Sequence, residues 1–194
     1  MKKICISDTQ VSLEPMPSDL SKKLSNAELK HYIALLEKAQ FYPHRAFEEV
    51  KEFQSKHPDL PEAMNLLTFV TIQKKEIAKA EKMIQESYEK FPHYLFARIN
   101  YADQCLRKKQ LQKIPEIFSS FNLKDLYPEK RVFHYSEFRG FMVTLGFYHL
   151  TLKNRKEAKE CLDHAKKADP DHSSVKLLEK KLRPNLFKRL LRLK

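Results

Sequence analysis

Residues 145–170 read LGFYHLTLKNRKEAKECLDHAKKADP, and the placing of the small residues in this stretch decides the fold. Gly146, Ala158 and Ala165 stand among larger apolar residues at helical spacing, and Pro170 follows Ala158 by twelve residues. Proline lacks a backbone donor and disfavours helical geometry in the residue before it, so Pro170 closes the second of two helices. The stretch therefore predicts one pair of packed helices.

The spacing of twelve residues from an alanine to a proline occurs twice more in the chain. Ala46 precedes Pro58 by twelve residues and Ala80 precedes Pro92 by twelve, so alanine and proline both recur after 34 residues. A period of this length is typical of stacked helix–turn–helix units, which bury their apolar faces against their neighbours and usually bind other proteins. The spacing predicts this class of function without indicating a particular partner.

The composition favours helix throughout the chain. Of its 194 residues, 42% are hydrophobic, which is enough for a continuous core. It contains only 2 glycines and no tryptophan, so tight hairpins and the glycine-rich loops that bind phosphates or dinucleotides are disfavoured. We predict an all-α protein that is not an enzyme and has no cofactor.

Neither the cysteines nor the histidines are spaced as metal ligands or as a disulfide framework. The three cysteines, Cys5, Cys105 and Cys161, include no CxxC pair, and none of the eight histidines forms an HxxxH or HExxH motif. Asp8 and Gln10 interrupt the N-terminal stretch too early for a secretory signal. No segment approaches the roughly 20 apolar residues that span a bilayer. We expect a cytoplasmic protein without a metal site.

Prolines and capping residues divide the chain into segments. Ser25 followed by Glu28 predicts a helix over about 27–40, and further helices are predicted over 61–73 and 76–90. The predicted organisation is an extended or disordered leader at 1–26, a helical-repeat domain at 27–183 with pairs near 27–58, 61–92, 94–122 and 134–170 and a capping helix at 171–183, and a basic amphipathic tail at 184–194.

These features resemble the tetratricopeptide repeat (TPR) family. The last copy matches best, and the copy at 61–92 also matches. In the first copy bulky Phe53 stands where the family has a small residue, and in the third Ile114 replaces the alanine. Ten extra residues, placed at about 122–133, interrupt the array and predict a bulge. The resemblance implies a right-handed superhelical solenoid of antiparallel helix pairs.

The resemblance also implies that the first helices of successive pairs line a concave groove that binds a peptide or a helix. Aromatic rings there would supply buried area, and asparagine can hydrogen-bond both to the carbonyl and to the N–H of a peptide. The alternative is that the rings fill the core between helices and the amides lie on a solvated face. The residues predicted to line the groove are Tyr32, Asn65, Phe69, Phe96, Asn100, Asp103, Arg107 and Phe147.

The C-terminal end is strongly basic. Seven Lys and Arg residues and no acidic residue lie between Lys180 and Lys194, so this segment carries more than half of the net charge of +12. Such a segment can cap the last repeat, or it can tether the protein to an anionic membrane or to RNA, which is an alternative function. An assembly or secretion chaperone that holds a client protein is a further alternative. The tail cations are Lys188, Arg189, Arg192 and Lys194.

Overall fold

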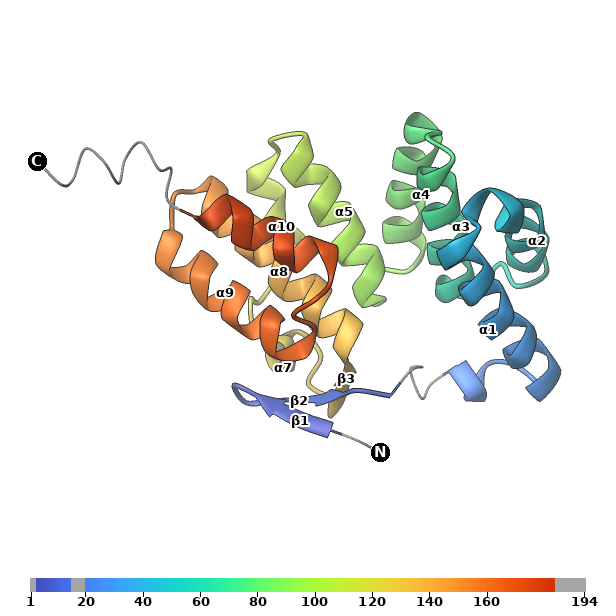
Figure 1. Ribbon diagram of the computed structural model, residues 1–194, viewed down its shortest axis with the longest axis horizontal. Coiled ribbons are helices and arrows are strands. Elements are labelled where there is room, and N and C mark those ends of the chain that lie inside the picture. Colours follow the sequence, from blue (N-terminus) through green and yellow to red (C-terminus); the bar gives the residue numbers. More distant parts are fainter. Residues whose placement is uncertain (1–2, 15–19, 184–194) are drawn as a thin grey trace, which may run out of the picture. The chain divides into compact units, whose positions relative to one another are not determined.

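A computed structural model of the chain describes residues 3–14 and 20–183 (Figure 1). Its contacts divide the chain into two compact units. Met16–Lys108 forms one, which we call the repeat unit, and Met1–Pro15 together with Lys109–Lys194 forms the other, which we call the discontinuous unit. The sequence predicted a single repeat domain, whereas the contacts divide the helices after Lys108. Each unit is described by itself.

The repeat unit consists of helices joined by short turns. Ser25 begins the first α-helix with a capping box, in which Glu28 N–H donates to the Ser25 hydroxyl and Ser25 N–H donates to the Glu28 carboxylate at 2.8 Å. Pro43 and Pro61 stand in the first turns of later helices, where a missing N–H breaks no helical hydrogen bond. The elements are η1 (Leu20–Lys22), α1 (Asn26–Phe41), α2 (Pro43–Lys56), α3 (Pro61–Gln73), α4 (Ile77–Lys90) and α5 (Leu95–Arg107).

The 34-residue period corresponds to the packing of adjacent helices. Consecutive helices from α1 to α5 contact one another, and α3 also contacts α1 and α5. Ala46 in α2 and Ala80 in α4 are only 0% and 1% exposed, because a close-packed helix contact leaves no room for a larger side chain. The predicted helical architecture of adjacent pairs is confirmed, and α1, α3 and α4 match the predicted ranges closely.

The discontinuous unit combines helices with three short strands. The two longest helices of this unit, α8 and α9, form its central pair. α10 packs against both of them. The third predicted pair has only a short second helix, in which Pro115 stands in the first turn. The elements are β1 (Lys3–Ile6), β2 (Thr9–Ser12), η2 (Leu111–Lys113), α6 (Ile114–Ile117), α7 (Leu123–Leu126), β3 (Val132–His134), α8 (Tyr135–Thr151), α9 (Arg155–Ala168) and α10 (Ser173–Leu182).

The three strands form one sheet in the order β1-β2-β3. β1 and β2 are antiparallel around a turn at Ser7, whose φ is 58°, and β2 is parallel to β3 with Val11 opposite Phe133. Ile6, Val11 and Phe133 are at most 1% exposed. The predicted leader thus contributes two strands, and the predicted bulge at 122–133 contributes much of the third. The hairpin was not predicted because Ser7, rather than a glycine, adopts the positive φ in its turn. The third strand was not predicted because it lies far from β2 in the chain.

His134 joins the sheet to the central helix pair. Its Nε2–H donates to the backbone carbonyl of Glu14 at 2.7 Å, and its Nδ1 accepts from the N–H of Ser136 in the first turn of α8. The Glu137 carboxylate accepts from His134 N–H at 2.9 Å and completes a capping box. Burial lowers the pKa of His134, so the neutral ring that both hydrogen bonds require is favoured.

The close approach of α10 to the central pair depends on a glycine. A Cβ on Gly146 of α8 would lie 2.4 Å from Leu178 Cδ2 of α10 and 3.5 Å from Cys161 Cβ of α9. His172 begins α10 by accepting from Ser174 N–H through Nδ1 at 3.2 Å. α10 therefore packs over the pair formed by α8 and α9.

Two further predictions concern the basic tail and membrane-spanning helices. The predicted basic tail, with Lys188, Arg189, Arg192 and Lys194, lies outside the described residues. Across residues 3–14 and 20–183, no helix combines the length and the apolar character that crossing a bilayer requires.

Candidate interaction surface

Two predicted groove residues meet on the first helices of neighbouring pairs. Asn100 Nδ2 of α5 donates to Asn65 Oδ1 of α3 at 2.8 Å, and both side chains are half-buried. Each helix presents its asparagine on the side away from its core residues, such as Leu66 of α3 and Ile99 of α5. Among the described residues, no other side-chain hydrogen bond involves the Asn65 amino group or the Asn100 carbonyl, so both can serve a further partner.

Apolar side chains continue this surface along α3. Phe69 and Ile72 lie one and two turns after Asn65, and each is 39% exposed although both are large and hydrophobic. Their neighbours Leu67 and Val70 are buried on the core side of the same helix. The sequence indicated Phe69 but not Ile72, although the spacing of three residues between them places both on one helical stripe.

Charged side chains extend the surface along α5. Arg107 Nε donates to Asp103 Oδ2 at 3.1 Å, and Arg107 Nη1 lies 3.5 Å from Glu81 Oε1 of α4. Lys108 also contacts Glu81, at 2.8 Å, and its hydrogen bond is the main cause of the lowered pKa of that carboxyl group. Asp103 and Arg107 are therefore already paired with each other, and Arg107 also with Glu81, in an exposed network of charges.

The structure removes one predicted residue from the surface. Tyr32 is 4% exposed, its ring packs 5.6 Å from the ring of Phe53, and its hydroxyl donates to the Glu62 carbonyl at 3.2 Å. Burial raises the pKa of Tyr32. The prediction that this ring lines a groove is corrected: its apolar body is held in the core and its polar end is satisfied there.

The two remaining phenylalanines are half-buried. Phe96 of α5 lies with its ring centroid 5.8 Å from that of Tyr94. Phe147 belongs to the discontinuous unit, where it packs against a core cluster that includes Val143, Leu162 and Leu178. The candidate surface in the repeat unit, which we call the α3–α5 surface, consists of Asn65, Phe69, Ile72, Phe96, Asn100, Asp103 and Arg107.

The chemistry of this surface suits recognition. It combines paired amides, an exposed aromatic ring and a local ion-pair network. Within the described parts of the chain, no group of three or more His, Cys, Asp and Glu side chains could hold a metal ion. Helical-repeat proteins as a class use their repeated surfaces to bind other proteins.

Comparisons with known proteins give similarities at the level of fold. The chain is similar to the MamA RS-1 ArsTM double mutant, with a TM-score of 0.48 and 14% identity over 82% of this chain and 93% of that one. It is also similar to YrrB, a TPR protein with an unusual peptide-binding site, with a TM-score of 0.36 and 16% identity over 84% of this chain and 95% of that one. No family model matches the chain, and no curated protein sequence matches it. Its function must therefore be argued from its own residues.

Proposed function

We propose that the chain is a non-catalytic protein-interaction scaffold that binds a peptide segment or a helix of a partner protein on the α3–α5 surface. The observation that carries the proposal is the Asn65–Asn100 pair, held at 2.8 Å beside the exposed ring of Phe69. Half-buried amides on adjacent first helices are already oriented before a ligand arrives, so little conformational entropy is lost on binding.

The two kinds of side chain have separate roles in this proposal. The Asn65 amino group donates to a carbonyl of the bound segment, and the Asn100 carbonyl accepts from one of its N–H groups. Phe69 and Ile72 supply apolar area that the ligand removes from water, which is the main source of affinity. The ion pair between Asp103 and Arg107 borders this area and disfavours a strongly charged ligand segment at that end.

A double substitution tests the amides without disturbing the fold. Replacing both members of a hydrogen-bonded pair by apolar residues leaves no buried group unsatisfied, so Asn65→Ala with Asn100→Ala should be nearly neutral for stability. Partner affinity should nevertheless fall by about tenfold, because about 1.4 kcal/mol of hydrogen bonding to the ligand is lost. Asn65→Ala alone should cost more stability, since it leaves one amide without its partner.

Photo-crosslinking identifies the partner against a matched control position. A photoreactive amino acid is placed at Phe69 or, in a second variant, at Ile77 of α4, which is also exposed, at 48%, but lies off the α3–α5 surface. Proteins captured from Phe69 and not from Ile77 are then purified and their affinities for the wild-type and double-substituted chains are measured by calorimetry. The proposal is wrong if those partners bind both chains equally well.

A further inference from the structure

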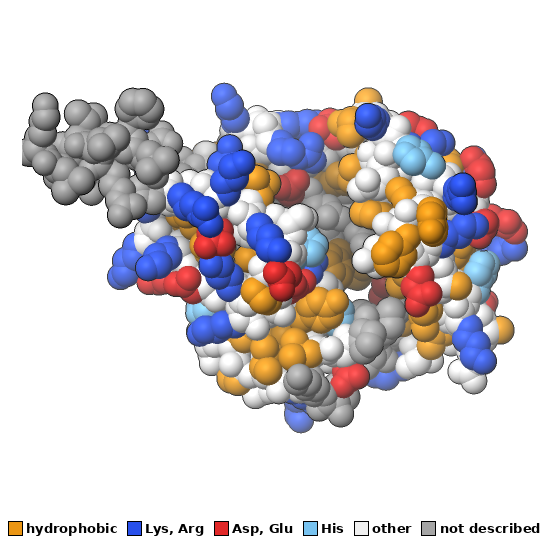
Figure 2. Space-filling model, viewed as in Figure 1, with side chains coloured by type: hydrophobic (Ala, Val, Ile, Leu, Met, Phe, Trp, Pro, Cys, Tyr) orange, Lys and Arg blue, Asp and Glu red, His pale blue; other side chains and the backbone are white. Residues whose placement is uncertain are grey.

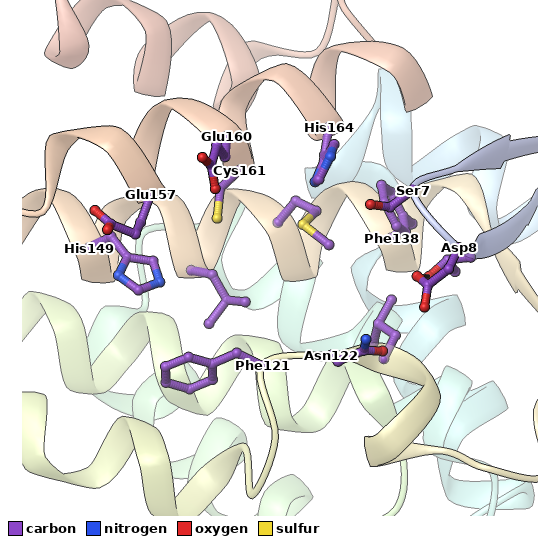
Figure 3. Close-up of a pocket in the computed structure, with 14 residues that line it drawn as sticks. Ser7, Asp8, Phe121, Asn122, Phe138, His149, Glu157, Glu160, Cys161 and His164 are labelled. Atoms are coloured by element: carbon purple, nitrogen blue, oxygen red, sulfur yellow. Dashed lines mark hydrogen bonds between the residues drawn. The ribbon is translucent and has the colours of Figure 1, made fainter.

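The discontinuous unit contains a cavity that no predicted site residue lines. It lies between the β1–β2 turn, the segment before α7, and the facing sides of α8 and α9 (Figure 3). Its volume is about 240 Å³. Its apolar lining comes from Phe121, Leu123, Phe138, Met142 and Leu145.

The size of the cavity limits what can fill it. Pockets for drug-sized molecules usually exceed about 300 Å³, whereas an apolar cavity of about 150 Å³ is large enough for benzene. A volume of about 240 Å³ therefore suits one aromatic ring with a smaller aliphatic group beside it. Two side chains of a peptide fit this description better than an independent small molecule.

The rim of the cavity is acidic. Glu157 and Glu160 follow each other by one turn on α9, both are exposed, and no ion pair to either of them is found among the described residues (Figure 3). His149 lies beside them in the lining, and burial lowers its pKa, so it adds no permanent positive charge at neutral pH. Asp8, by contrast, is paired with Lys124 at 3.6 Å.

This acidic rim stands out against its surroundings. Lys and Arg side chains are prominent on the visible surface over α9 and α10 (Figure 2). The whole chain carries a net charge of +12. Two carboxylates beside an apolar cavity, with no ion pair to either from residues 3–14 or 20–183, therefore favour a ligand that is both basic and apolar.

We propose that this cavity binds the chain's own C-terminal segment, residues 184–194, with apolar side chains inserted in the cavity and cations near Glu157 and Glu160. The segment reads PNLFKRLLRLK, with four cations and no acidic residue. Phe187 supplies a ring and Leu186 or Leu190 an aliphatic group, which matches the volume. The charges are complementary to the rim.

The end of the described chain lies close enough for this contact. Arg155 in the first turn of α9 donates through Nη2 to the carbonyl of Leu182, the last residue of α10. Glu157 follows Arg155 by only two residues on the same helix. Eleven extended residues span up to about 36 Å, whereas the 14 residues of α9 are about 21 Å long. Phe187, five residues after Leu182, reaches about 17 Å from it, which covers most of the length of α9.

Covalent attachment makes weak affinity sufficient. A short linker holds the segment at an effective concentration in the millimolar range. A segment that would bind as a free peptide with a dissociation constant of about 100 μM would thus occupy its site about nine-tenths of the time when attached. This proposal concerns the discontinuous unit alone and is independent of the function proposed for the α3–α5 surface.

The test uses the full chain with a photoreactive amino acid at Phe187. After irradiation, we expect intramolecular cross-links to the cavity lining, mapped by mass spectrometry to α8, α9 and the segment around Phe121. Glu157→Lys with Glu160→Lys should reduce their yield by about fivefold or more, because attraction at two positions becomes repulsion. Adding Lys188→Glu and Arg189→Glu to that variant should restore the yield.

A matched control separates this effect from the change in net charge. Glu86→Lys with Glu89→Lys on α4 changes the charge equally at the same spacing of three residues, and both carboxylates are exposed, so the cross-link yield should not change. The proposal is overturned by cross-links that map away from the cavity, by cross-links between two copies of the chain, or by an equal loss in the control variant.

Discussion

The hydrogen bond from His134 to Glu14 should stabilise the attachment of the N-terminal strands by an amount that can be isolated. His134 has two roles: it caps α8 through Nδ1, and it donates to the Glu14 carbonyl through Nε2 at 2.7 Å. His134→Asn preserves the capping oxygen, because asparagine is a good N-cap residue, but its shorter side chain does not reach Glu14. His134→Ala removes both contacts.

The expected magnitudes follow from these two contacts. A hydrogen bond contributes about 1 kcal/mol to stability, and an N-cap contributes about 1 kcal/mol. His134→Asn should therefore destabilise the discontinuous unit by about 1 kcal/mol and His134→Ala by about 2 kcal/mol. His172→Ala is the matched control, because His172 caps α10 in the same way. It should cost about 1 kcal/mol without affecting the strands.

Hydrogen exchange of the full chain measures the effect where it should appear. Local opening is reported residue by residue, so the two units need not unfold together. In His134→Asn, the amides of β2 that pair with β3 should exchange about fivefold faster, which corresponds to about 1 kcal/mol. They should be unchanged in His172→Ala. Equal β2 exchange in His134→Asn and the wild type would show that this hydrogen bond contributes nothing to holding the strands.

Three further predictions concern the same unit. Burial lowers the pKa of His134 and of His172, so the unfolded chain binds protons at a higher pH than the folded chain does, at about 6.5. The urea concentration at the unfolding midpoint should be constant above that pH and decrease below it. A midpoint that does not change with pH would contradict the burial of these rings. Gly146→Val should cost about 1–3 kcal/mol in urea unfolding by displacing Leu178, and Leu178→Ala should recover part of the loss in the double variant, unlike two independent sites. Burial raises the pKa of Cys161 to about 11, so iodoacetamide at pH 8 should label its thiol roughly a hundredfold more slowly than in the unfolded chain, as followed by mass spectrometry.

The sequence predicted those features that depend on local signals. The capping pair at Ser25 and the proline at position 61 act within one turn of a helix, so α1 and α3 were found with nearly correct limits. Ala46 and Ala80 repeat because each faces a neighbouring helix that is close in the chain. The asparagines of α3 and α5 were placed on one surface for the same reason.

The features that were missed depend on distant contacts. β2 is four residues long, and its pairing with β3 more than a hundred residues later cannot be read from its neighbours in the chain. Its nearer partner β1 was missed because the turn between them contains no glycine. Tyr32 was misplaced because a tyrosine on a helix can face either a groove or a core, and the carbonyl of Glu62 that satisfies its hydroxyl is visible only in the structure. The cavity between α8 and α9 likewise depends on the β1–β2 turn.

The division of the discontinuous unit between the two ends of the chain has a consequence for its synthesis. His134 is made 120 residues after Glu14, which at 5–20 residues per second is a delay of about 6–24 s. During that time the ribosome releases the whole repeat unit, whose residues are contiguous and which can fold without waiting. The first two strands meanwhile have no third strand to join and no α8 to cover them. The nascent chain therefore carries an unpaired strand edge at its front end until translation passes β3, and such an edge can pair with a strand of another chain.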